Sequence, residues 1–199
     1  YEGIKIQLVE MPAIFEGYAY KGDGPTFFSL MRGADLIIFL IDTTQTEKKQ
    51  LETLYREFEK AQIKLNVRKP KVSVQRRASG RIEFSGKKFF QCDLKEATNL
   101  LIMNGYHNAV VSASEPVTID DLASVMYESL VYLPHLVAYT KGDLTGKGIS
   151  VKTSKGIADI KDRIFHALKI IRVYTKTPGK EKDWPPVALK TGATVRDLA

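Results

Sequence analysis

Several features are scarce or missing in this 199-residue sequence, and each absence excludes a class of protein. The single cysteine, Cys92, rules out an internal disulfide and fits a reducing compartment, most simply the cytoplasm. The three histidines, His107, His135 and His166, lie far apart and lack the spacing of a metal site. No apolar run approaches the roughly 20 residues that cross a membrane. A membrane partner is therefore not expected.

A phosphate-binding loop is also missing, because the pattern G-x-x-x-x-G-K-[ST] occurs nowhere in the sequence. The chain starts at Tyr1 inside an apparent strand and stops with "GATVRDLA" inside an apparent helix. Both ends therefore look cut. We expect a fragment of a longer protein, with the missing loop encoded upstream.

Positive charge, in contrast, is abundant and local. The net charge is +7, and the segment 64–88 alone holds nine Lys or Arg against one acid, Glu83, for a net charge of +8. A clustered basic segment attracts polyanions. This clustering favours nucleic-acid binding over a basic surface that is merely solvated.

The basic segment also has strand character. The stretch "KVSVQRRASGRIEFSG" predicts a hairpin that turns at Ser79 and Gly80. Such a turn would hold three arginines together at an exposed tip: Arg76, Arg77 and Arg81. We expect these three side chains to contact RNA phosphates.

The rest of the chain alternates between strand and helix patterns, which predicts a doubly wound α/β fold with a parallel sheet. Strands are expected at 4–11, 34–42, 132–143 and 148–154, and amphipathic helices at 46–63 and 157–171. The segment 8–25 holds three glycines and predicts a long flexible loop, of which 19–26 is the mobile part.

A change of character divides the chain into four expected regions. The segment 67–129 combines the basic strands with helices at 94–105 and 118–130 and a strand at 108–114, so it is interpreted as an inserted basic α+β domain. Thr118 is a plausible N-cap. The main domain is then 1–66 and 130–170, and a strand pair leading into a helix forms a small module at 171–199.

Polar residues follow three of the expected strands, in "EMPA", "TKGD" and "SVK". Ligands of open α/β sheets bind at the carboxyl ends of strands. In order and spacing, the chain resembles the second half of a GTPase domain of the Obg class, and most closely the developmentally regulated GTP-binding proteins. "VEMPA" resembles the D-x-P-G motif of switch II, "TKGD" the guanine-reading N-K-x-D, and "SVKTSKGI" the S-A-K loop. The end of the chain, from "IIRVYTKTPG", resembles the start of a TGS domain.

The resemblance implies a P-loop GTPase-like sheet that lacks its P-loop half, an inserted domain and the start of a β-grasp TGS domain. It implies GTP or GDP as ligand, with Mg²⁺ held through water by Glu10, and contacts to the phosphate from the turn around Ala13. It also implies a ribosome or structured RNA and a regulatory protein as partners. The residues implied to bind nucleotide are Glu10, Met11, Pro12, Ala13, Thr140, Lys141, Asp143, Ser150, Val151 and Lys152.

Three positions depart from the family motifs: Glu10 stands for the usual Asp, Ala13 for Gly and Thr140 for Asn. Ala13 restricts the backbone where a phosphate would approach. Two functions therefore stay open. One is a GTPase switch that acts on the ribosome or RNA, inactive in this chain alone because the P-loop is missing. The other is an RNA- or ribosome-binding scaffold whose G domain does not hydrolyse GTP.

Overall fold

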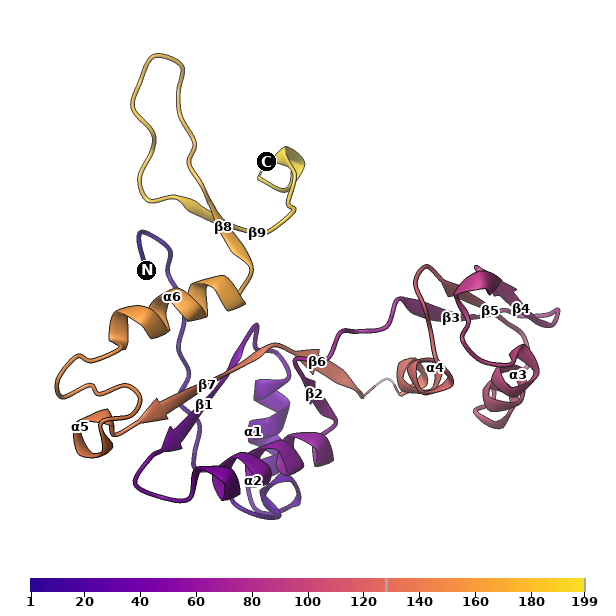
Figure 1. The fold of residues 1–199 in the computed structure, drawn as a ribbon. Helices are drawn as coiled ribbons and strands as arrows, with labels where there is room; N and C mark the ends of the chain where they lie inside the picture. The colour runs from indigo at the N-terminus through magenta and orange to yellow at the C-terminus, as the bar shows by residue number, and fades with distance from the viewer. Residues whose placement is uncertain (128, 199) are drawn as a thin grey trace. The chain divides into compact units, whose positions relative to one another are not determined.

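The computed structural model describes residues 1–127 and 129–198 and divides them into two compact units, shown in Figure 1. Unit 1 comprises Tyr1–Asn66 and Leu133–Ala199, and unit 2 comprises Val67–Tyr132. Both units mix helices with strands, and each contains parallel strand pairing. The expected mixed α/β class with parallel strands is thus confirmed. None of the helices in the described ranges is long and apolar enough to cross a membrane.

Unit 1 is built around two parallel strands, β1 and β7, which pair from Ile37 with His135 to Asp42 with Thr140. Two further strands, β8 and β9, pair antiparallel near the end of the chain. Its elements are η1 (Tyr18–Tyr20), α1 (Gly24–Met31), β1 (Ile37–Asp42), α2 (Glu47–Lys60), β2 (Ile63–Leu65), β7 (His135–Thr140), α5 (Gly142–Thr145), α6 (Ile157–Ala167), β8 (Ile170–Val173), β9 (Val187–Lys190) and η3 (Val195–Asp197).

Aromatic packing joins α1, β1 and α2 in unit 1. The ring of Phe58 in α2 lies 5.1 Å from the rings of both Phe28 in α1 and Phe39 in β1, measured between centroids. All three side chains are buried. Edge-to-face aromatic contacts of this kind add to the burial of apolar surface. The amphipathic pattern of α2 therefore does what the sequence predicts and covers β1.

Unit 2 consists of a three-stranded sheet with helices on one face (Figure 1). Its core joins Val72, Val111 and Ala113 of the sheet to Leu101 and Leu122 of the helices. Thr118 caps α4 through a capping box with Asp121, as its position predicted. The elements are β3 (Val72–Arg76), β4 (Ile82–Ser85), η2 (Lys87–Phe89), α3 (Leu94–Met103), β5 (Ala109–Ala113) and α4 (Ile119–Met126), and the short strand β6 (Val131–Leu133) spans the boundary with unit 1.

The predicted hairpin at Ser79 and Gly80 is wrong. The strand order is β3-β5-β4, so β5 lies between the two strands that the turn connects. Arg76 and Ile82 both pair with Ala109, one from each side. The chain does reverse direction between β3 and β4, but turn chemistry does not determine whether the flanking strands pair with each other.

Two other predicted strands are also absent. Residues 4–11 form extended chain with no sheet partner among the described residues, and residues 148–154 form bends and turns. A strand requires the backbone of a neighbour, which the alternation of apolar residues cannot reveal. The predicted loop over 8–25 is wrong in its second part, because Ala19 is buried in η1 and α1 begins at Gly24, whereas the mobility of 19–26 stays a prediction.

Candidate functional site

The carboxyl end of β7 leads into a loop held by many hydrogen bonds. Lys141 has left-handed backbone angles, φ 64° and ψ 29°, and the short helix α5 starts immediately after it. The amide of Ile149 donates to the carbonyl of Tyr139 at 2.7 Å, and the amide of Gly142 donates to the carbonyl of Ile149 at 3.0 Å. These two bonds bring the predicted "TKGD" and "SVK" segments side by side.

Glycine is required twice for this contact. A Cβ at Gly148, whose φ is +89°, would lie 2.3 Å from the carbonyl oxygen of Tyr139. A Cβ at Gly142 would lie 2.5 Å from the carbonyl oxygen of Gly148. Neither distance is possible for a real side chain, so both positions exclude every other residue while the loop keeps this shape.

A side-chain bond links the two segments at their tips. The Ser150 hydroxyl donates to Oδ1 of Asp143 at 3.0 Å and itself accepts from the amide of Thr153 at 3.3 Å. Ser150 is buried, whereas Asp143 is exposed. The Asp143 carboxylate is thus fixed through one oxygen, and its other oxygen has no partner among the described residues. A fixed carboxylate at a strand end can accept hydrogen bonds from a ligand.

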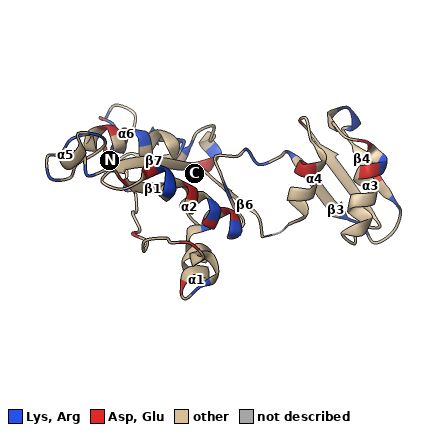
Figure 2. Cartoon of the chain, turned by 60° about the horizontal axis from the view of Figure 1, so that its bottom comes forward, with Lys and Arg blue, Asp and Glu red and all other residues tan. Residues whose placement is uncertain are grey.

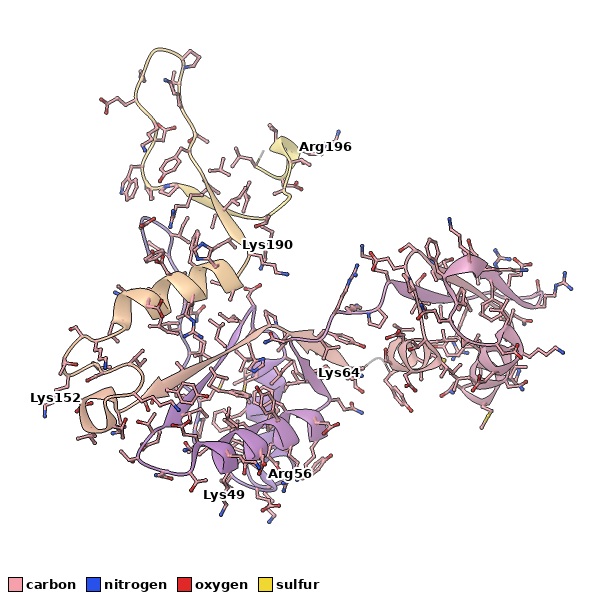
Figure 3. The ribbon with its side chains drawn as sticks, in the orientation of Figure 1. Lys49, Arg56, Lys64, Lys152, Lys190 and Arg196 are labelled. Atoms are coloured by element: carbon pink, nitrogen blue, oxygen red, sulfur yellow. The ribbon has the colours of Figure 1, made fainter. Side chains whose placement is uncertain are left out.

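The turn after Ser150 offers donors of its own. The amide of Ser150 donates to the carbonyl of Lys155 at 3.0 Å and is therefore occupied. The amides of Val151 and Lys152 donate to no other group within the described ranges. Both residues are exposed, and the Lys152 side chain extends outward from the loop (Figure 3). Two free backbone donors therefore lie next to the Asp143 acceptor.

The hydroxyl and carbonyl of Thr140 both bond to the neighbouring strand β1 or the residue that follows it. The Thr140 hydroxyl donates to the carbonyl of Ile41 at 3.1 Å, and the Thr140 carbonyl accepts from the Thr43 hydroxyl at 2.6 Å. The Thr43 hydroxyl also bonds the Thr145 hydroxyl at 2.7 Å. The hydroxyl that Thr140 keeps in place of the usual amide is therefore used to attach the loop to β1.

Electrostatic contacts from neighbouring elements support the same loop. Lys147 binds Glu47 at the start of α2 at 2.6 Å and lies over the ring of Tyr139 at 4.5 Å from its centroid. The hydrogen bond to Glu47 raises the pKa of Lys147 above its ordinary value. At the end of β1, hydrogen bonds from Thr44 hold the pKa of Asp42 below its ordinary value. Both charges are therefore kept over a wide pH range.

The predicted phosphate side looks quite different. Glu10, Pro12 and Ala13 are exposed, Met11 is partly exposed, and no described residue forms a hydrogen bond or ion pair with any of them. The structure does not join these residues to the Asp143 loop through any bond. The described residues also contain no group of three or more His, Cys, Asp or Glu that could hold a metal ion. Glu10 could serve Mg²⁺ only together with nucleotide phosphates, the usual arrangement for that ion.

One buried carboxylate that the sequence did not reveal binds the backbone just after this segment. Glu57 of α2 is fully buried and accepts from the amides of Gly17 at 2.9 Å and Ala19 at 2.8 Å, and from Lys60 at 2.6 Å. Burial acts to raise its pKa, but the bonds from Ala19, Lys60 and Gly17 outweigh burial and lower it. Glu57 thus attaches η1 to α2. Its position three residues after Leu54, on the buried face of α2, was the available signal.

Comparison with known proteins finds relatives that match the whole length of this chain. No family model matches the chain. It is 31% identical over its full length to the human developmentally-regulated GTP-binding protein 2, and 33% identical over its full length to an uncharacterized GTP-binding protein of Methanocaldococcus jannaschii. A fission yeast relative named GTP-binding protein 1 is 28% identical. The chain spans 58%, 56% and 58% of these three proteins, respectively. The chain is thus, over its full length, a homologue of proteins named developmentally-regulated GTP-binding proteins.

Proposed function

We propose that this chain supplies the guanine-binding part of a GTP-binding switch that acts on the ribosome or on structured RNA. The observation that carries the proposal is the Asp143 carboxylate, fixed by Ser150 at the end of a parallel strand, in a chain whose relatives are named GTP-binding proteins. An open α/β sheet places its ligands at such strand ends.

The arrangement suits guanine better than adenine. The Asp143 carboxylate offers only acceptors, so it selects a base edge that carries two neighbouring donors, as guanine does. The free amides of Val151 and Lys152 can donate to the guanine oxygen. Lys141 is exposed, and its aliphatic stem can cover the face of the base. Together these residues would read one base without contacting the phosphates.

The phosphate side is proposed as the part that moves. Glu10 would hold a water of Mg²⁺, and the turn of Met11, Pro12 and Ala13 would meet the terminal phosphate. The bound Mg²⁺ ion and phosphate would supply the charge that orders a switch segment. Residues 5–14 form no hydrogen bond or ion pair with any other described residue, which supports this role. Phosphate binding also needs a loop of the P-loop type, which these 199 residues do not contain.

The partners are proposed from charge and family. Unit 2 is proposed to be the inserted domain expected at 67–129, and the β8–β9 pair to be the start of the TGS domain expected at 171–199. We assign RNA or ribosome contact to unit 2, and place the protein in the cytoplasm with a regulatory protein as a further partner. The alternative is a scaffold that binds RNA without hydrolysing GTP. Glu10 and Ala13, which replace the usual Asp and Gly, favour it.

Nucleotide specificity tests the base site. GDP and XDP are titrated separately into the 199-residue chain and into D143N, and NMR follows the amide shifts of residues 140–155. We expect wild type to prefer GDP and D143N to prefer XDP, because the amide presents a donor where the carboxylate accepted. D159N, which makes the same change on the exposed face of α6, should leave the preference for GDP intact. Equal affinities of wild type and D143N for both nucleotides would overturn the site.

Hydrolysis decides between the switch and the scaffold. Single-turnover GTP cleavage would be measured for this chain and for a form joined to a phosphate-binding loop. Cleavage by the joined form that is lost in D143N supports the switch. Nucleotide binding without cleavage in the joined form supports the scaffold.

A further inference from the structure

The sheet of unit 2 has one covered face and one open face. Along β5, Ala109, Val111 and Ala113 are buried against the helices, whereas the alternate residues Val110 and Ser112 are partly exposed. Helices α3 and α4 both lie on the same side of the sheet (Figure 1). Successive side chains of a strand point to opposite faces. The open face therefore carries Ser73, Gln75, Val110, Ser112, Glu83 and Ser85.

Three serines form a row across this open face. Ser112 of the central strand pairs with Ser73 of β3 on one side and with Ser85 of β4 on the other. Neighbouring strands lie about 4.8 Å apart, so the row spans roughly 10 Å. None of the three hydroxyls bonds to another group in the part of the chain that the structure describes. The row thus presents three free groups that can both donate and accept.

Basic residues lie at the edge of the same face. Arg77 lies opposite Asn108, to whose carbonyl its amide donates at 2.9 Å, and Arg81 lies just before β4. Arg77 pairs with Glu83 at 3.0 Å, but both side chains are about half exposed. Exposed pairs of this kind contribute little and can be exchanged for a phosphate. Arg81 has no partner of opposite charge among the described residues.

Acidic residues lie mainly on the other side. Asp120 and Asp121 belong to the first turn of α4, and Glu96 belongs to the first turn of α3 (Figure 2). The helical face of unit 2 therefore carries most of its negative charge. Of the acidic residues that the structure describes, only Glu83 lies on the open sheet face, where it pairs with Arg77. This segregation makes the open face the better surface for a polyanion.

No aromatic side chain lies on the open face among the described residues of β3, β4 and β5. Phe84, Phe89, Phe90 and Tyr106 pack against the core on the covered side. Sheets that bind single-stranded RNA stack its bases on aromatic residues, which this face cannot do. Double-stranded RNA is recognised differently, through phosphates and 2′-hydroxyls across a wide and shallow minor groove. A flat sheet with a row of free hydroxyls and arginines at its edge suits that groove.

We propose that the open face of the β3-β5-β4 sheet docks on the sugar and phosphate groups of double-stranded RNA. The three serine hydroxyls meet 2′-hydroxyls, and Arg77 and Arg81 bind phosphates. This inference rests on the proposed RNA partner and names its class. It also removes Arg76 from the predicted contact, because that side chain lies 4.0 Å above the ring of Tyr106 and donates to the carbonyl of Gly105 at 2.8 Å.

Binding of the full 199-residue chain to three probes tests the proposal. Fluorescence anisotropy would compare an RNA duplex of about 20 base pairs, a DNA duplex of the same sequence and one of the RNA strands alone. We expect the RNA duplex to bind at least about tenfold more tightly than the other two, because only it presents 2′-hydroxyls in a wide minor groove. Similar affinity for both duplexes, or a preference for the single strand, would overturn the proposal.

Variants locate the contact on the protein. R81A should weaken duplex binding about three- to tenfold and lower the slope of log affinity against log salt by about 0.7 to 0.9. S112D should weaken it at least about tenfold, because it places a carboxylate in the centre of the face. S73D, on an exposed edge position, repeats that test if S112D fails to fold. K95A removes an exposed charge from α3 and is the matched control.

The outcomes separate this inference from the function on which it rests. Duplex binding that R81A, S112D and S73D leave at the level of K95A would overturn the open face and retain the RNA partner. Failure of all three probes to bind would overturn the RNA partner itself, and the inference with it. Thermal unfolding of each variant would show that losses of binding do not come from loss of structure.

Discussion

The two halves of the proposed nucleotide site differ in how they are held. The loop around Asp143 is fixed by backbone bonds between two segments, by the Ser150 hydroxyl and by the Lys147–Glu47 pair. Residues 5–14 have no hydrogen bond or ion pair to any other described residue. Base recognition can thus be built in advance from local contacts. The phosphate side needs something outside these residues, a neighbouring strand or a ligand, to give it a defined shape.

Hydrogen exchange should show this contrast most strongly. We expect the amides of Gly142, Ile149 and Ser150 to exchange at least about 100 times more slowly, relative to their intrinsic rates, than those of residues 5–14, because only the former are hydrogen-bonded. Mass spectrometry of peptic fragments would measure it. Equal protection of the two segments would contradict this contrast. Added GDP should leave the exchange rates of residues 5–14 unchanged.

Removing glycine should break the fixed half. G148A should destabilise unit 1 by at least about 2 kcal/mol, because the new Cβ overlaps the carbonyl of Tyr139 and the left-handed backbone disfavours Ala. G146A is the matched control, since its φ is also positive, at +75°, but no heavy atom lies within 4 Å of the added Cβ. Urea unfolding would measure both. Similar losses for the two variants would mean that backbone strain alone matters.

Glu57 holds the backbone just after the unbonded segment 5–14, through the amides of Gly17 and Ala19. E57Q should destabilise unit 1 by about 1 to 3 kcal/mol, because one buried amide loses its acceptor. Since the pKa of Glu57 is lowered in the folded state, its contribution is present above its ordinary pKa and is lost as pH falls through the lowered value.

The E57Q effect should accordingly shrink in acid, which urea unfolding at a series of pH values would show. E59Q, an exposed glutamate on the same helix, should change stability by less than about 0.5 kcal/mol. A pH-independent loss in E57Q would mean that packing, and not the ionised carboxylate, holds η1.

The smallest expected effect concerns the Asp143 carboxylate, the proposed acceptor of the base. S150A removes the bond to Asp143 and should weaken GDP binding by about 1 kcal/mol, roughly fivefold, because the carboxylate is no longer fixed. NMR titration would measure it. T153A removes an exposed hydroxyl that bonds to no other described group, and should leave GDP affinity unchanged. Unchanged affinity in S150A would show that Asp143 does not need Ser150.

The sequence predicted what local patterns determine. Strands β1 and β7, helices α2 and α6 and the cap at Thr118 all follow from periodicity or from one polar residue at a helix start. Pairing could not be predicted in the same way. The strand that separates β3 from β4 arrives more than 20 residues later, so the turn at Ser79 and Gly80 looked like a hairpin.

The candidate site was likewise predictable from the sequence only in part. Motif spacing predicted the segments of Asp143 and Ser150, and the structure brings them together. The roles of Gly142 and Gly148 could not be predicted, because they depend on how closely two distant backbones approach. Glu57 was missed because an acidic residue in a charged helix looks solvated until the chain folds over it.

The hydrogen bonds of Asn66, the residue after β2, have a consequence for the separation of the two units by protein engineering. The amide of Asn66 donates to the carbonyl of Leu133 at 2.9 Å, and its side chain bonds both the amide and the carbonyl of His135. The chain therefore departs into unit 2 and comes back at neighbouring points. Residues 67–132 thus form an insertion that leaves unit 1 and returns to it at one place. A short glycine bridge from Asn66 to Leu133 should leave unit 1 folded, and the excised piece could be transplanted into an unrelated surface loop with its own fold retained.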